Sequence, residues 1–234
     1  MVKLERILFY LKSLKMLRYS VHTLINLLLF TLWLSVVSCQ EKRYHAEATR
    51  VNLDTIPEHL KAVYEWQRNK NEYFFDPSTS PLRPKEKKRF DGLDFFTPTD
   101  EYQVKALFRE ALKKDTIQLK TTTSSVTNEI VYGNLFFQLN DRYHVLPVYR
   151  EVNASDDYVF LPFTDLTNGD LTYGGGRYID LTYPLKDSVL IDFNKAYNPY
   201  CAYNPKYSCP LVPTTNHLET MILAGEKSFD LFKK

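Results

Sequence analysis

From Thr99 onward, apolar residues alternate with polar ones at a period of two, as in strands with one buried face. The pattern predicts strands in residues 102–110, 117–119, 158–163, 178–183 and 189–193, and a hairpin in 131–149 that turns at Asn140-Asp141. The segments between these strands have no room for crossover helices. We therefore expect a mainly β fold, with an antiparallel meander that forms a barrel or sandwich.

One helix is expected before the sheet. Residues 54–74, DTIPEHLKAVYEWQRNKNEYF, place Pro57 in a first turn and put Leu60, Val63 and Tyr64 on one side at helical spacing. This pattern predicts a helix from about Pro57 to Asn71. Prolines at positions 81 and 84 limit the next segment to a loop and one short helical turn.

The N-terminal sequence is typical of a bacterial lipoprotein signal. A basic lead precedes the apolar block 24–37, and small residues lead into Cys39. We expect residues 1–38 to be removed, with translation starting at Met1 or Met16, and Cys39 to carry the lipid. Residues 39–55 would be a tether and 56–234 a single mainly β domain on a bacterial outer-membrane lipoprotein. An uncleaved transmembrane anchor is the alternative, although the apolar block is short.

The charge balance argues against a nucleic-acid partner. The whole chain has 30 Lys or Arg, 28 Asp or Glu, and a net charge of +2. Removal of residues 1–38 takes away five basic side chains and one acidic one, which leaves a net charge of −2. No arginine-rich stripe or recognition motif remains.

A glycine-rich segment is the first candidate site. Residues 160–181, FLPFTDLTNGDLTYGGGRYIDL, hold four of the seven glycines, and the last of the four directly precedes Arg177. Successive amides there can form a concavity for a carboxylate or phosphate. The alternative is a plain sheet connection, in which Asp165, Asn168 and Asp170 form side-chain turns. No helix follows the glycines, so this is not a nucleotide-binding motif.

Several long motifs resemble the bacterial family known as domain of unknown function 1684. They are the stretches 162–181 and 192–213, NHL at 216–218, AGEK at 224–227, SPL at 80–82 and FDGLDFF at 90–96. The resemblance spans about Pro57 to Lys227 and departs from the family at Val212, where proline is usual. It implies no established activity.

Two cysteines lie in the stretch DFNKAYNPYCAYNPKYSCP, residues 192–210. In an oxidising compartment we expect Cys201 and Cys209 to form a disulfide across the turn at Asn204-Pro205. Two alternatives remain open: Cys201 acts as a nucleophile with His217 as its base, or both cysteines and His217 hold zinc. We expect neither a metal nor a cofactor.

Acidic residues offer another route to catalysis. Asp165, Asp180, Asp192 and Glu226 lie in or beside the family-like motifs, and two of them could act as acid and base, with Arg177 holding an anionic group. The alternative is structural: Asp192 accepts backbone hydrogen bonds, and Glu226 pairs with Arg177 inside the protein.

The sequence therefore predicts a lipid-anchored envelope protein that binds a small polar or anionic ligand, such as a glycan or a cell-wall fragment, through loops 165–177 and 192–210. The predicted ligand-binding residues are Asn168, Arg177, Tyr178, Asn194, Asn198 and Tyr203. One alternative is a hydrolase that uses a pair from Asp165, Asp192 and Glu226, or Cys201. The other is a structural partner in the envelope.

Overall fold

The sheet follows from the alternating pattern beyond Thr99. The computed structural model describes residues 51–229, which belong to one compact unit. Its strands are β1 (Gln103–Glu110), β2 (Thr116–Lys120), β3 (Val126–Leu139), β4 (Arg142–Glu151), β5 (Tyr158–Asp165), β6 (Arg177–Thr182), β7 (Ser188–Asp192) and β8 (His217–Leu218). The hairpin between β3 and β4 turns at Asn140 and Asp141, which both have positive φ as the sequence predicts.

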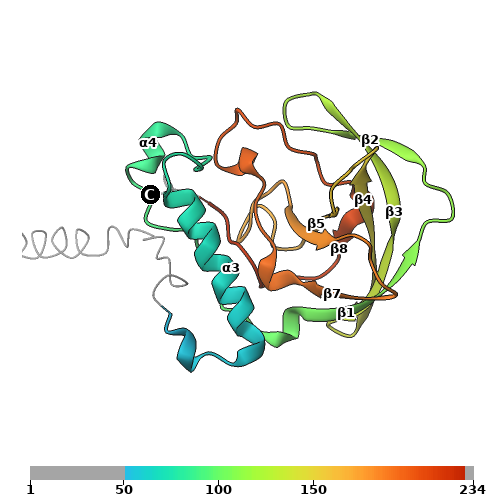
Figure 1. Ribbon diagram of the computed structural model, residues 1–234, viewed down its shortest axis with the longest axis horizontal. Coiled ribbons are helices and arrows are strands. Elements are labelled where there is room, and N and C mark those ends of the chain that lie inside the picture. The colour runs from blue at the N-terminus through green and yellow to red at the C-terminus, as the bar shows by residue number, and fades with distance from the viewer. Residues whose placement is uncertain (1–50, 230–234) are drawn as a thin grey trace, which may run out of the picture. The chain divides into compact units, whose positions relative to one another are not determined.

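All strands belong to one curled sheet with the order β6-β5-β4-β3-β1-β7 (Figure 1). Strand β2 pairs with β3, and the short β8 pairs in parallel with β5, while the other pairings are antiparallel. The sheet curls into a half-barrel. Strands β6 and β7, which follow one another in the chain, form the two ends of its strand order. The predicted mainly β, antiparallel fold is confirmed.

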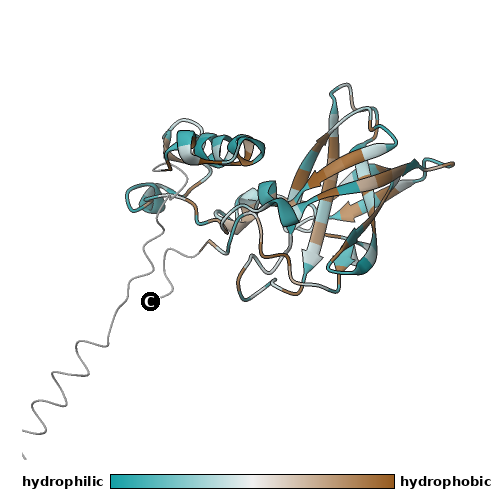
Figure 2. Cartoon of the chain, turned by 90° about the horizontal axis from the view of Figure 1, so that it is seen from below, coloured by the Kyte–Doolittle hydropathy of each residue, from teal (hydrophilic) through white to brown (hydrophobic). Residues whose placement is uncertain are grey.

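Both faces of the sheet carry apolar side chains. The strands contain many hydrophobic residues, coloured brown in Figure 2. Along β5, Val159, Leu161 and Phe163 enter the main core, whereas Phe160 points to the opposite face. A second cluster on that opposite face comprises Leu119, Tyr149, Phe160 and Tyr178. This second face therefore needs its own cover.

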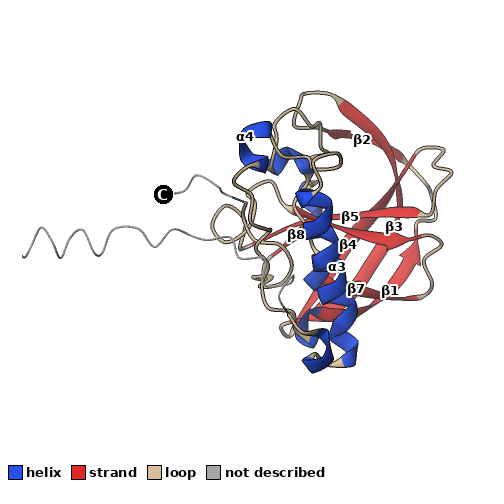
Figure 3. Cartoon of the chain, turned by 60° about the vertical axis from the view of Figure 1, so that its left-hand side comes forward, coloured by secondary structure: helices blue, strands red, loops and turns tan. Residues whose placement is uncertain are grey.

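Helix α3 (Glu58–Phe75) lies beside the sheet (Figure 3). It is four residues longer than predicted at its C-terminal end and stops before Pro77, with the Asp76 N–H donating to the Glu72 carbonyl. Its buried stripe, at helical spacing, comprises Leu60, Val63, Gln67, Asn71 and Phe74. Phe74 packs with Leu82, Phe90, Leu93 and Tyr203 in a third cluster.

Short helical turns complete the fold: α4 (Pro84–Lys87), as predicted near the prolines, and the 3-10 turns η1 (Leu53–Thr55), η2 (Asp100–Tyr102), η3 (Phe193–Lys195), η4 (Tyr200–Ala202) and η5 (Thr214–Asn216). Within residues 51–229, no helix has the length and apolar character needed to cross a membrane. The predicted signal segment 1–38 and Cys39 lie outside the described residues.

Two glycines with positive φ differ in how much space surrounds them. A Cβ added at Gly225 (φ +76°) would lie 2.5 Å from the Ala196 carbonyl oxygen, whereas one added at Gly169 (φ +84°) would meet nothing within 4 Å. Alanine at either position carries the left-handed backbone cost of about 1–2 kcal/mol. Only Gly225→Ala adds a clash, which we expect to cost about 1–3 kcal/mol more.

Urea unfolding of Gly225→Ala and Gly169→Ala compares the two costs directly. Equal losses in the free energy of unfolding would contradict the close contact between residues 225 and 196.

Candidate functional site

Arg177, which the sequence predicts to bind an anionic group, forms internal contacts that brace the protein instead. Its Nη2 donates to Asp165 at 2.9 Å and to the Ile222 carbonyl at 3.0 Å, and its Nη1 donates to the Ala224 carbonyl. Both side chains of the Arg177–Asp165 ion pair are fully buried. Asp165 also accepts from the Thr167 N–H at 2.9 Å. This brace ties the 165–177 loop to the segment that follows β8, and it offers no open guanidinium for a ligand.

Three predicted ligand-binding asparagines also make internal bonds. Asn168 donates to the Tyr173 carbonyl at 2.8 Å, which closes the turn that the sequence indicates. Asn194 accepts from the Thr99 N–H at 3.1 Å and donates to the Thr99 carbonyl at 2.8 Å. Asn198 donates to the Lys227 carbonyl at 2.8 Å. These contacts join loop and turn segments to one another.

The three candidate catalytic carboxylates have separate sets of partners. Asp165 pairs with Arg177, whereas Asp192 accepts from Gln103 at 3.0 Å and from the Asn194 N–H at 3.1 Å. Glu226 is buried and accepts from the Tyr203 hydroxyl, and burial raises the pKa of its carboxyl. These contacts join none of the three carboxylates to another, and the acid–base pairs proposed from the sequence stay predictions.

The structure holds Cys201 and Cys209 as free thiols, so it does not contain the predicted disulfide. The Cys201 N–H donates to Cys209 Sγ at 3.2 Å. A hydrogen bond from the Cys209 thiol lowers the pKa of Cys201 to about 6, although burial opposes this shift. The Tyr173 hydroxyl lies 3.9 Å from Cys201 Sγ.

His217 has partners other than the cysteines. Its Nδ1 lies 2.9 Å from the Thr164 hydroxyl and its Nε2 3.5 Å from a Glu219 carboxylate oxygen. These contacts support neither the zinc site nor the Cys201–His217 pair. Across residues 51–229, no three His, Cys, Asp or Glu side chains group as a metal site.

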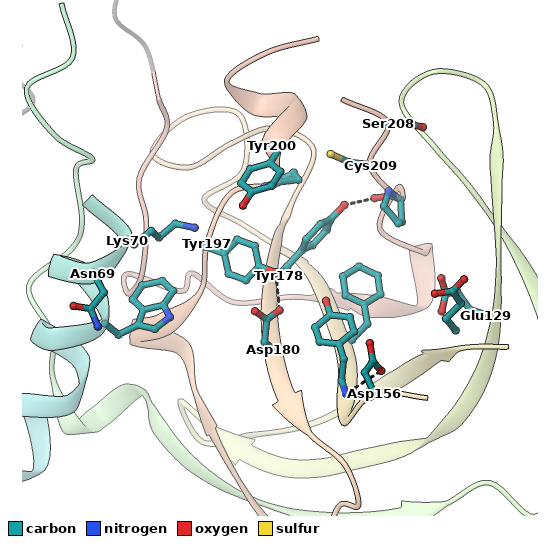
Figure 4. Close-up of a pocket in the computed structure, with 16 residues that line it drawn as sticks. Asn69, Lys70, Glu129, Asp156, Tyr178, Asp180, Tyr197, Tyr200, Ser208 and Cys209 are labelled. Atoms are coloured by element: carbon teal, nitrogen blue, oxygen red, sulfur yellow. Dashed lines mark hydrogen bonds between the residues drawn. The ribbon is translucent and has the colours of Figure 1, made fainter. Parts of the chain in front are cut away.

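A cavity of about 490 Å³ lies over the second apolar face of the sheet (Figure 4). Its lining comes from α3, from the outer face of β3 to β6 and from the 192–210 segment. The residues are Trp66, Asn69, Lys70, Glu129, Glu151, Asp156, Tyr158, Phe160, Tyr178, Asp180, Tyr197, Pro199, Tyr200, Ser208, Cys209 and Pro210. Of the predicted ligand-binding residues, Tyr178 lines this cavity, and loop 165–177 contributes nothing to it.

Strand pairing explains why these residues meet. Phe160 of β5 lies opposite Asp180 of β6, so both project from the same face. Tyr197 pairs with Tyr178 through two backbone hydrogen bonds of 2.9 and 3.0 Å. Further along, Pro210 bridges to Thr121 at the end of β2. The 192–210 segment is thus attached at both ends and arches over the cavity.

The cavity has Glu129 and Glu151 at one end and the Lys70 amine at the other (Figure 4). Glu129 and Glu151 lie directly opposite one another on β3 and β4, and burial raises the pKa of Glu129. The Tyr197 hydroxyl donates to Asp180 at 2.6 Å, and burial raises the pKa of Tyr197. Lys70 lies across the cavity from Glu129 (Figure 4). A ligand would therefore meet acceptors at one end and a donor at the other.

Sequence reasoning missed the helix and β3–β4 contributions to this cavity. A signal existed for its floor, because Tyr158, Phe160 and Tyr178 alternate with core residues and so give the sheet two apolar faces. A second signal is the pair Trp66 and Lys70, which lies four residues apart beside the buried stripe of α3.

Comparison with known proteins gives the family but no activity. The solution NMR structure of an uncharacterized protein from Haloarcula marismortui is similar, with 33% identity over 73% of this chain and 94% of that chain and a TM-score of 0.60. The curated proteins contain no match. The family described as "Protein of unknown function (DUF1684)" matches residues 88–227. The chain belongs to that family.

The buried brace predicts a large stability difference between two ion pairs. Arg177→Met leaves Asp165 charged and buried without its partner, so we expect a loss of about 3–5 kcal/mol in the free energy of unfolding. The control is Lys227→Met, which breaks the half-exposed 3.1 Å pair with Asp94 at an expected cost of about 0–1 kcal/mol. Denaturant unfolding measures both, and a similar small loss in the two variants would contradict the structural role of Arg177.

The thiol arrangement predicts selective alkylation. At pH 7 we expect iodoacetamide to label Cys201 before Cys209 without prior reduction, because Cys201 with its pKa of about 6 is largely a thiolate there. Cys209→Ala removes the hydrogen bond and should raise the Cys201 pKa, which slows labelling at pH 7 but not at pH 9.5. Peptide mapping distinguishes the two sites. If labelling requires a reductant, the two cysteines form the disulfide predicted from the sequence, and the free-thiol arrangement is wrong.

Proposed function

We propose that this protein binds a small polar ligand, such as a glycan or a cell-wall fragment, in the cavity. The cavity itself carries the proposal, since its volume of about 490 Å³ lies within the roughly 300–1,000 Å³ typical of ligand sites. The 192–210 segment proposed from the sequence contributes to it, and the 165–177 loop is not needed.

The lining supports a ligand that has both apolar and polar faces. Six aromatic side chains surround the space: Trp66, Tyr158, Phe160, Tyr178, Tyr197 and Tyr200. Aromatic rings provide rigid apolar contact area, and tyrosine hydroxyls add hydrogen bonds at their edges. Sugar rings and similar small molecules offer the matching combination of C–H faces and hydroxyl groups.

The charges narrow the ligand class. Four carboxyl side chains line the cavity, those of Glu129, Glu151, Asp156 and Asp180, against the single amine of Lys70. A strongly anionic ligand would meet repulsion from the carboxylates. Hydroxyl or amino groups would instead donate to them. We therefore favour a ligand rich in hydrogen-bond donors over the anionic one that the sequence allowed.

The proposal keeps the protein at the bacterial envelope, attached by lipid on Cys39. Its support is the sequence alone: the basic lead, the apolar block 24–37 and the small residues before the cysteine. With a tether from Gln40 to about Arg50, the cavity would face ligands outside the cytosol.

Tryptophan fluorescence tests the ligand proposal. Trp33 and Trp66 are the two tryptophans, so a Trp33→Phe chain reports from the cavity through Trp66 alone. We expect neutral or amino oligosaccharides to change its emission saturably and phosphorylated sugars to bind more weakly. Tyr200→Ala in this background should lower affinity about tenfold, a loss of ~1.4 kcal/mol of binding free energy.

Tyr143→Ala is the matched control, because Tyr143 is 86% exposed near the β3–β4 turn and lies outside the cavity. No saturable change with any sugar or muropeptide fragment would contradict ligand binding and favour the structural envelope role.

A further inference from the structure

Lys70 is an amine that faces aromatic rings in place of hydrogen-bond acceptors. Its Nζ lies 4.3 Å from the ring centre of Tyr197 and 5.6 Å from those of Trp66 and Phe74. Within residues 51–229 it makes no ion pair and donates no hydrogen bond to a protein atom. Figure 4 shows its side chain reaching from α3 toward Tyr197. An ammonium has three donors to satisfy, and this site satisfies none with protein oxygen.

Burial shifts Lys70 toward the neutral amine, relative to an exposed lysine. Burial lowers the pKa of Lys70, although the negative charges of Glu226 and Asp180 act in the opposite direction. Tyr197, the ring closest to the amine, stays a neutral phenol because burial raises its pKa. A neutral amine next to an open cavity has a lone pair available for reaction.

We propose that Lys70 is a nucleophilic amine that forms an imine with a small aldehyde or ketone, such as an open-chain sugar, bound in the cavity. The inference rests on the proposed ligand cavity and adds a reaction to it. It follows from the amine's position in the cavity, its aromatic surroundings and its missing hydrogen-bond partners.

The proposed step balances without an outside redox partner. The Lys70 nitrogen attacks the carbonyl carbon, a C–N bond forms, and the carbonyl oxygen leaves as water with the two hydrogens of the amine. The resulting imine takes up a proton to become a cation. The same three rings and the Asp180 carboxylate, which accepts from Tyr197 at 2.6 Å, would stabilise that positive charge.

Reductive trapping tests the proposal. The full-length chain is incubated at pH 7 with glyceraldehyde and cyanoborohydride, and peptide mapping gives the modification rate at each lysine. We expect Lys70 to react at least ten times faster than Lys105, an exposed lysine on β1. The Lys70 rate should level off at a lower pH than that of an ordinary lysine, whose pKa is about 10.4, because burial lowers the Lys70 pKa.

Two readouts, the trapping rate at Lys70 and the Trp66 emission of the Trp33→Phe chain, separate this inference from the ligand proposal. Lys70→Arg removes the reactive amine and should lose trapping at residue 70, because a guanidinium does not form an imine with an aldehyde under these conditions. If Lys70 reacts no faster than Lys105 while Trp66 reports sugar binding, the imine is wrong and the binding site stands. If neither trapping nor a fluorescence change occurs, both proposals fail. A Lys70 rate that keeps rising up to the ordinary lysine pKa of about 10.4 would also overturn the inference, because it would indicate an ordinary ammonium.

Discussion

The structure depends on the need to cover a sheet that is apolar on both faces. One face curls inward around Leu135, Leu146 and Leu161 and fills the half-barrel. The other presents Phe160 and Tyr178, which would remain in water unless something packed above them. Burial of apolar area is worth roughly 25 cal/mol per Å², so this second face is a strong attraction for α3 and the 192–210 segment.

The cover is incomplete, and the cavity is the space that it leaves. Helix α3 supplies Trp66 and Lys70 on one side, and the arch of the 192–210 segment supplies Tyr197 and Tyr200. The arch keeps its shape through backbone pairing to β6 and the contact of Pro210 with the β2 end, without a disulfide. The buried Arg177–Asp165 pair stabilises the adjoining loops but stays out of the cavity. The glycine-rich 165–177 loop therefore supports the scaffold, and the cavity belongs to the 192–210 segment together with ordinary strand and helix residues.

The sequence predicts the individual strands and the helix but not which strands pair with one another. Alternation at a period of two predicts every strand from β1 to β7, and helical spacing predicts α3, because these patterns follow from local geometry. The order of the strands in the sheet could not be predicted in this way. Strand β1 lies between β3 and β7, an arrangement that depends on pairing between residues about 80 positions apart, as in Val104 with Ile191. No local pattern encodes such a partner.

The site was harder to predict from the sequence for the same reason. Arg177, Asp165 and Glu226 attract attention as charged residues in conspicuous motifs, yet their partners are the Ile222 and Ala224 carbonyls and the Tyr203 hydroxyl, which only the fold brings near. The cavity's carboxylates, such as Glu129, look like common outward residues of strands.

The central claim is that a ligand enters the space between α3, the outer sheet face and the 192–210 segment. Amide chemical-shift mapping of the ¹⁵N-labelled protein with an oligosaccharide library tests it most directly. We predict shifts clustered at residues 66–70, 158–160, 178–180 and 197–210. Shifts centred instead on the 165–176 loop, or none with any compound, would contradict it.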